Sequence, residues 1–532
     1  MHRNQSVNTH QFAMIPKSDI PRSKFDCQST HKTTFDAGYL VPVYVDEMLP
    51  GDTFNLNMTA FARLATPLYP IMDNMILDSF FFFVPNRLVW SHWQQFMGQQ
   101  ANPADSISYT VPQQVSPAGG YTIGSLQDYM GLPTVGQVAG SNTVSHCAFW
   151  TRGYNLIWNE WFRDENLQNS VVVDTGDGPD TVSNYTLLRR GKRKDYFTSA
   201  LPWTQKGNPV TLPLGTSAPV VSTGAQPTFS STQATNAGLV TTGSPDRLVA
   251  LGLNGTNNPA WFGNVTGLYA DLSSATAATI NQIRQSFQIQ KLLERDARGG
   301  TRYTEIVRSH FGVASPDSRL QRPEYIGGGS TPVNINPIAQ TSATGVSGGS
   351  TPMGTLAAMG TVLAHKHGFT YSSVEHGIII GLVSIRADLT YQQGMHKMWS
   401  RSTRYDFYFP VFSHLGEQSI LNKEIYVDGS SNDNNVFGYQ ERWAEYRYNP
   451  SRISSLFRST ASGTLDAWHL AQKFTALPTL ASTFIQDTPP VSRVVAVGSS
   501  ANGQQFIFDS FFDVKKARPM PMYSVPGLVD HF

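Results

Sequence analysis

β-Strand patterns lie near both ends of this chain, and helical or loop patterns fill the middle. From Thr53 to Leu64 apolar and polar side chains alternate, which predicts a strand with one buried face. Residues 71–84 predict a second strand that ends in the run Phe80–Phe83, and a continuous apolar run indicates that both faces are covered. Later strands are predicted at 368–391, 405–409, 491–497 and 505–516.

Because early strands must pair with late ones, the sequence predicts an antiparallel barrel or jelly roll held by non-local contacts. The segments between the strands predict insertions. Apolar residues at helical spacing mark four helices, and a Gly/Ser/Thr-rich stretch marks a loop at 327–354. The predicted helices are 88–97, 147–167, 276–298 and 301–311. We therefore expect a mainly β fold with long helical and loop insertions.

The charge content of the chain excludes several classes of protein. Only 14% of the 532 residues are charged, against about 25% in typical soluble domains, and 39 basic and 38 acidic residues nearly balance. A charge-rich disordered chain and a uniformly basic nucleic-acid binder are therefore excluded. Cys27 and Cys147 do not form a disulfide framework. We expect no membrane insertion, because the most apolar runs are much shorter than a spanning helix, and no secretory signal.

Two segments differ in composition from the rest. Residues 1–32 are polar and mildly basic, and we expect an extended basic arm, with a frayed terminus as the alternative. Residues 203–279 contain few charges and are rich in Ser, Thr, Gly, Ala and Asn, without sustained strand or helix periodicity. Trp261, Phe262 and Tyr269 give this second segment some capacity for burial, so we predict a folded surface insertion with little β structure.

Basic clusters are the candidate nucleic-acid contacts, because lysine and arginine bind phosphates through counterion release. A nuclear-localisation signal or a salt-bridge patch between subunits would have the same composition. The densest cluster lies between residues 189 and 194, and weaker ones lie in the arm and near the C-terminus. The candidate residues are Arg3, Lys17, Arg22, Lys24, Arg189, Arg190, Lys192, Arg193, Lys194, Lys515, Lys516 and Arg518.

The sequence predicts no catalytic residue, no cofactor and no metal site. The zincin, nucleophile-elbow and phosphate-binding-loop motifs are absent. His365, His367 and His376 have only Glu375 as an acidic neighbour, and their spacing fits a zinc site poorly. We interpret these histidines as solvated or satisfied within the core.

Several segments resemble the major capsid proteins of gokushoviruses, the small single-stranded DNA phages of the Microviridae. The resemblance covers nearly the whole chain, with the segments in the same order. One departure is Thr204, where the family pattern has proline. The segments that carry it are 35–42, 46–52, 195–203, 322–328, 388–394, 441–447 and 526–532.

The resemblance implies an eight-stranded antiparallel jelly roll, sixty copies of which form an icosahedral shell around circular single-stranded DNA. Together with the composition, it predicts four parts: the basic arm 1–32, core strands with helical insertions at 33–202, the surface insertion 203–279, and helical insertions with the remaining strands and an extended C-terminus at 280–532. It implies that 203–279 forms a protrusion at the three-fold axes that faces the host receptor. Trp261, Phe262 and Tyr269 would pack there between three copies.

The resemblance also implies partners and a location. A small basic DNA-packaging protein, a scaffolding protein and a host cell-surface receptor are the expected partners. The protein is expected in the virion after assembly in the bacterial cytoplasm. The alternatives from the residues alone are a carbohydrate-binding or carbohydrate-active β-protein that uses the tryptophans of 147–167, and a phage receptor-binding protein that forms no shell. The amphipathic spacing of those tryptophans favours burial in a core over a binding role.

Overall fold

The computed structural model describes residues 21–210, 280–314, 321–341, 353–496 and 504–523, and the backbone of short strands within 220–270 and 344–351. The described residues form two compact units. The larger unit lies within residues 1–204 and 300–532, and the smaller one within Gln205–Gly299.

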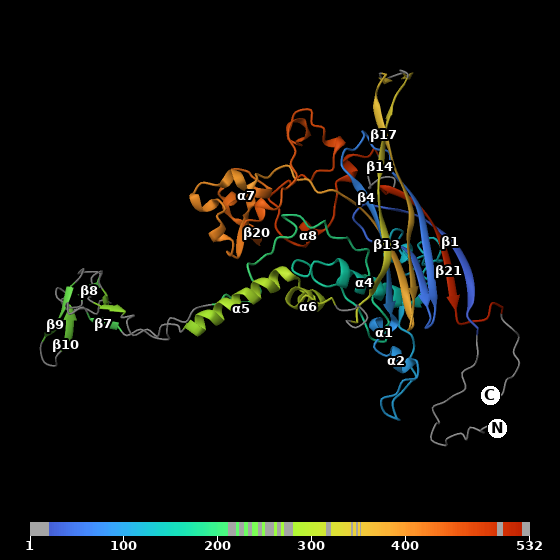
Figure 1. The fold of residues 1–532 in the computed structure, drawn as a ribbon, viewed down its shortest axis with the longest axis horizontal. Helices are drawn as coiled ribbons and strands as arrows, with labels where there is room; N and C mark the ends of the chain where they lie inside the picture. Colours follow the sequence, from blue (N-terminus) through green and yellow to red (C-terminus); the bar gives the residue numbers. More distant parts are fainter. Residues whose placement is uncertain are drawn as a thin grey trace. The chain divides into compact units, whose positions relative to one another are not determined.

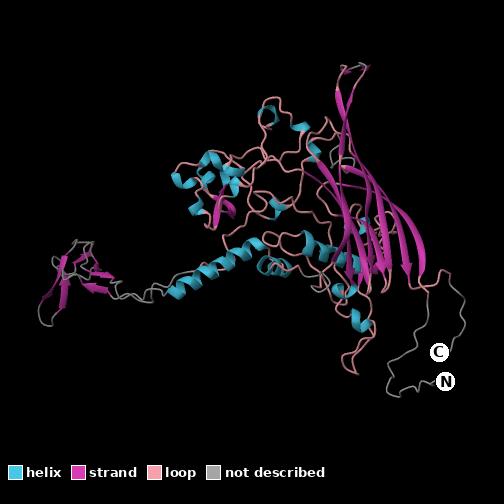
Figure 2. Cartoon of the chain, viewed as in Figure 1, coloured by secondary structure: helices cyan, strands magenta, loops and turns pink. Residues whose placement is uncertain are grey.

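The larger unit is built on one antiparallel sheet of eight long strands (Figures 1 and 2). The end strands β1 and β2 approach each other, so the sheet is nearly closed. A further strand, β14 (Asn334–Ala339), pairs with β17 in a hairpin. The predicted mainly β fold with an eight-stranded antiparallel jelly roll is confirmed. The strand order is β1 (Ser23–Phe35), β21 (Phe506–Arg518), β3 (Thr53–Leu64), β17 (Leu356–Ser372), β13 (Glu324–Pro332), β4 (Met75–Pro85), β18 (Gly377–Ala387) and β2 (Val41–Met48).

Strands from opposite ends of the chain pair along their whole length, as the sequence predicts. β1 pairs with β21 from Ser23↔Arg518 to Phe35↔Phe506, and β3 lies between β21 and β17. The alternation in β3 turns its apolar residues inward, where Phe54, Leu56 and Met58 are buried. Residues 23–32, assigned to the arm in the sequence analysis, are extended and belong to β1. Residues 1–20 lie outside the described residues.

The predicted coverage of both faces of the Phe80–Phe83 run is confirmed. Phe81 and Phe83 belong to the core between the two halves of the sheet. Phe82 and the alternate residues of β18 face a second core formed with α1 (Asn86–Val89) and α4 (Phe149–Ile157). Burial on both faces explains why β18 reads as an unbroken apolar strand.

Residues 327–354, predicted as a loop, instead contain strands β13 and β14, and the prediction was wrong. β13 joins the two halves of the sheet through the single pair Gly328↔Gly368. A Cβ on Gly368 would lie 1.9 Å from Leu56 O, and one on Gly328 would lie 2.1 Å from Ser79 O. Only glycine lets the backbones of β3 and β4 approach these two positions so closely, so the glycine content that indicates a loop marks a strand junction here.

Three other segments differ from their predictions. The single strand predicted at 368–391 is a hairpin of β17 and β18. Residues 405–409 and 491–496 contain 3₁₀ turns at Arg404–Asp406 and Val491–Arg493. Asp406 accepts hydrogen bonds from the backbone of Ser402 and Thr403, and this capping box at the start of the 3₁₀ turn overrides the β propensity of the neighbouring aromatic residues.

The remaining elements of the larger unit are short. Trp90 is extended and splits the predicted helix 88–97, and a π-helical turn, η1 (Trp158–Phe162), continues α4. In the C-terminal half of the chain, α7, α8 and the hairpin β19–β20 surround a third core. These elements are α2 (Trp93–Phe96), β5 (Gln113–Val115), α3 (Leu126–Tyr129), β6 (Ser145–Cys147), α6 (Tyr303–Phe311), β15 (Thr344–Val346), β16 (Gly349–Thr351), β19 (Glu417–Leu421), α7 (Asn422–Ile425), β20 (Val436–Glu441) and α8 (Ser482–Ile485).

The smaller unit contains short antiparallel strands and helix α5 (Ile280–Gly299). The sequence shows no strand period here, because each strand has only three to six residues. The side chains of Trp261, Phe262 and Tyr269 lie outside the described residues, so their predicted packing stays a prediction. The strands are β7 (Val220–Ser222), β8 (Thr228–Ser231), β9 (Ala237–Thr242), β10 (Arg247–Ala250), β11 (Ala260–Phe262) and β12 (Leu268–Ala270).

Candidate assembly surface and basic cluster

The basic run Arg189–Lys194 lies in the larger unit, where its backbone hydrogen-bonds to the segment Ile485–Asp487. Arg189 lies over the ring of Tyr39, with 3.9 Å from Cζ to the ring centroid, and donates to the Asp487 carbonyl at 3.1 Å. Arg190 donates to Asp78 Oδ2 at 2.5 Å and lies over Phe80. These two guanidinium groups therefore bind parts of the fold that are distant in sequence.

The other three cations of the run differ in exposure. Lys192 is only 7% exposed; its Nζ donates to Gln472 Oε1 at 2.8 Å, and burial lowers its pKa to about 8. Arg193 pairs with Asp388 at 3.2 Å, and Lys194 pairs with Asp164. The side chains of Arg193 and Lys194 remain about half exposed. These two are the members of the run that a ligand can reach most directly.

The cations near the C-terminus bind a different part of the sheet. Lys516 pairs with Asp46, and Arg518 pairs with Asp52 at 3.1 Å. Both lie over the ring of Phe54, and they tie β21 to β2 and β3. Lys515 is exposed on β21. The described residues show no contact partner shared between this cluster and Arg189–Lys194.

The candidate cations of the arm are only partly described. Arg22 donates to Thr53 Oγ1 at 2.8 Å, and Lys24 lies 3.6 Å from Asp26. Arg3 and Lys17 lie outside the described residues. The contact of all these cations with nucleic acid stays a prediction.

Asp487 gives the basic run a pH-dependent contribution to stability. Its side chain is 1% exposed and its Oδ2 has no hydrogen-bond partner, so burial raises its pKa to about 6 despite the nearby Lys192 and Arg190. The folded state thus holds a proton that the unfolded state releases at about pH 4.

The wild type should therefore lose stability relative to Asp487→Asn as pH rises from 4 to 6.5. The pKa of Asp487 differs by about two units between the folded and unfolded states, which corresponds to a loss of at most about 3 kcal/mol in the free energy of unfolding. Urea unfolding of both chains at pH 4.5 and 6.5 measures it. A stability difference between the two chains that does not change with pH would contradict this assignment.

An exposed aromatic surface lies on residues 401–415 and 442–446, which the sequence analysis did not single out. We call it the aromatic–arginine patch. Its rings contact one another: Tyr408 lies 5.5 Å from Trp443 and 6.3 Å from Tyr446 between centroids. Three arginines lie over these rings. The exposed members of the patch are Arg404, Tyr405, Phe407, Tyr408, Phe409, Val411 and Tyr446, the partly buried ones are Arg401, Phe412 and Arg442, and the buried Trp443 lies beneath them.

The exposure of this patch is unusual for its composition. Tyr405 is 69% exposed and Val411 is 80% exposed. A contiguous apolar surface of this kind marks a contact site, since isolated exposed apolar residues are ordinary but clusters are not. Aromatic residues and arginine are also the types enriched at the centres of protein interfaces. The sequence signal for this surface was a run of aromatic residues around a capping box, Thr403 to Asp406, without the alternation of a half-buried strand.

The patch has a rigid base. The indole of Trp443 donates to Phe412 O at 3.1 Å, and Arg401 pairs with the buried Glu445 at 3.5 Å. Glu445 in turn accepts a hydrogen bond from Gln418 on β19. Side chains held in place in this way lose little conformational entropy when a partner docks.

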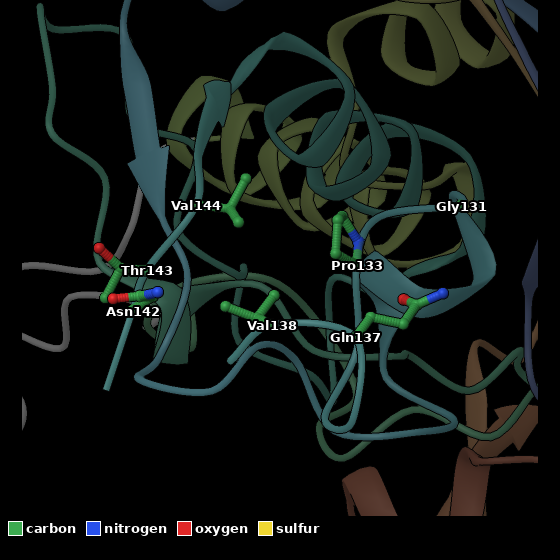
Figure 3. Close-up of a pocket in the computed structure, with 7 residues that line it drawn as sticks. All are labelled: Gly131, Pro133, Gln137, Val138, Asn142, Thr143 and Val144. Atoms are coloured by element: carbon green, nitrogen blue, oxygen red, sulfur yellow. The ribbon is translucent and has the colours of Figure 1, made fainter. Parts of the chain in front are cut away.

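The described residues show no arrangement typical of a catalytic or metal centre. A shallow cavity of about 590 Å³, lined by residues between Gly131 and Val144, has no charged side chain (Figure 3). Within the described ranges no group of three or more metal-ligating side chains comes together. His367 is buried between Ser79 and Thr331, at 2.9 and 2.8 Å. No helix of the described residues is long and apolar enough to cross a membrane.

The chain is similar to known proteins over nearly its whole length. Residues 13–528 match the model of the family described as capsid protein (F protein). Capsid protein VP1 of Bdellovibrio phage phiMH2K is 48% identical over 99% of both chains. Capsid protein VP1 of Chlamydia phage 1 is 44% identical, and that of Spiroplasma virus 4 is 35% identical, each over 98% of both chains.

Proposed function

The chain belongs to the family of phage capsid proteins (F proteins), and from this premise we propose that sixty copies form a small icosahedral shell around circular single-stranded DNA. As a member of this family the chain is a structural, non-enzymatic protein of the virion that assembles with copies of itself. The number of copies, the enclosed DNA and assembly in the bacterial cytoplasm belong to the proposal.

The aromatic–arginine patch is the observation that supports assembly most directly. A single folded chain exposes this surface to water, and burying it against other copies removes apolar area from water. The low charge content of the chain agrees with a surface that is largely subunit contact. The near-zero net charge also agrees with a separate small basic protein that neutralises the DNA, and a scaffolding protein would guide assembly.

We further propose that residues 203–279 form spikes at the three-fold axes that attach to a host receptor. The segment forms part of a separate compact unit and has few charges, which suits packing of three copies against one another. Replacing residues 211–279 with a short Gly/Ser linker should leave shells intact and abolish attachment to host cells. Shells that attach normally, or loss of all assembly, would contradict the spike.

The mass of the native particle tests the shell. Sixty subunits of 58.6 kDa give about 3,500 kDa, whereas an adhesin would stop at a small oligomer. Light scattering and negative-stain microscopy of the protein expressed in bacteria, alone and with a co-expressed scaffolding protein, measure mass and shape. Uniform particles near this mass are expected. Only small oligomers under both conditions would contradict the proposal.

A further inference from the structure

A cavity of about 870 Å³ lies beside the basic run, within the larger unit. One part of its wall is cationic and another part is aromatic. The cationic residues are Arg163, Arg190, Lys192, Arg193, Lys194, Arg302 and Arg386, and the aromatic ones are Phe80, Phe82, Trp161, Phe162 and Tyr325. Asp164 is the one acidic residue among the residues that line it.

The carboxylates that bind these cations mostly lie outside the wall of the cavity. Asp78 accepts from Arg190 at 2.5 Å and lies 3.1 Å from Arg386, so one carboxylate serves two guanidinium groups. Asp388 binds only one edge of Arg193. The face of the cavity is therefore basic, although the surrounding fold is nearly neutral in charge.

The two Nη groups of Arg386 are unused donors within the described part of the chain. Its buried Nε lies 3.1 Å from Asp78 Oδ2 in an ion pair, and among the described residues neither of its Nη atoms makes a hydrogen bond. Burial and, after it, the neighbouring Arg190 lower the pKa of Arg386. An anion in the cavity would satisfy these donors, because a phosphate accepts two parallel hydrogen bonds from one guanidinium.

The aromatic part of the wall is available for stacking. Tyr325 on β13 is 43% exposed, and its ring lies 6.4 Å from Phe80 and 6.1 Å from Trp161 between centroids. Arg322 lies over Trp161 at 4.3 Å. Tyr325 is the exposed ring among those that line the cavity, and an exposed ring beside a cationic groove is an arrangement that binds single-stranded nucleic acid, since every base has a flat face that stacks.

We propose that this cavity binds a nucleotide unit of single-stranded DNA, with its phosphate on Arg190, Arg193 and Arg386 and its base against Tyr325. The inference rests on the proposed function, because the enclosed DNA supplies the ligand. The volume suits one or two nucleotides. A duplex has its bases stacked inside and offers only phosphates to this wall.

Fluorescence anisotropy of a labelled eight-nucleotide oligo-dT with the full-length subunit tests the proposal. Arg193→Gln should weaken binding about tenfold and reduce the salt dependence by about one phosphate contact. Inorganic phosphate should displace the oligo-dT from the wild type only weakly. Tyr325→Leu should weaken oligo-dT binding about tenfold, yet leave the affinity for inorganic phosphate unchanged. Arg447→Gln is the matched control, since Arg447 is equally exposed and also paired with a carboxylate, Glu441, but lies outside the cavity.

Each outcome decides the proposal. Wild-type binding by both variants, or no binding by the wild type, would overturn it. Equal affinity for a duplex, or weaker oligo-dT binding in Arg193→Gln alone, would mean that the cavity binds only phosphate, and this would also overturn the proposal. Arg193 is half exposed, so that variant should fold. Particle mass is measured separately: shells of full mass with unchanged oligo-dT binding refute the cavity alone, whereas absence of shells refutes the proposed function.

Discussion

Replacing Gly368 with alanine is expected to prevent folding of the jelly roll. Gly368 on β17 faces β13 at the one register pair that joins the two halves of the sheet. Its Cβ would lie 1.9 Å from Leu56 O and 3.2 Å from Asn57 Cα, and both are backbone atoms that cannot rotate away. Relief requires β17 to separate from β3, which would break the ladder along both strands.

The cost of this substitution should lie at the upper end of overpacking, about 3 kcal/mol or more. The expected result is insoluble protein, or soluble protein whose thermal transition is lost or lowered by many degrees. Gly191→Ala is the matched control, because the nearest atoms to its new Cβ lie at 3.8 Å. A soluble Gly368→Ala chain with the same melting temperature as Gly191→Ala would contradict the account of the junction.

The outline of the fold could be predicted because its signals are local. The alternation in 53–64 and the phenylalanine run at 80–83 each reveal how many faces of a strand are buried. The junction at Gly328 and Gly368 could not be predicted, since the reason for glycine there is a backbone from another strand. A glycine-rich strand and a glycine-rich loop have the same composition, and only pairing separates them.

In the candidate sites, too, local features could be predicted and contacts with distant segments could not. The basic run at 189–194 is visible as a cluster of charges in the sequence. Its environment is not, because the carboxylates of Asp78, Asp388 and Asp164 come from distant segments. The same is true of the rings of Phe80 and Tyr325, which strand pairing brings beside the run. The aromatic residues at 405–409 favoured a strand, since hydrophobic pattern alone does not distinguish burial within a chain from burial between chains.

The second large effect is expected at the aromatic–arginine patch. The double variant Tyr405→Glu, Val411→Glu should fold as a subunit and fail to form particles. Both side chains are mostly exposed, so the new carboxylates stay hydrated in the single chain. In an assembled shell these carboxylates would lose their hydration inside an apolar contact, and each buried charge costs about 2–5 kcal/mol at every copy of the contact.

Light scattering should show the variant as a monomer or small oligomer, while circular dichroism and the melting temperature of the subunit stay near those of the wild type. Tyr405→Phe, Val411→Leu is the matched control, because it keeps the apolar surface and should form particles of full mass. These two variants separate assembly from folding because neither changes Trp443 or Glu445, on which the patch rests. Particles of normal mass from the glutamate variant would show that the patch faces solvent in the shell and would exclude it as an assembly contact.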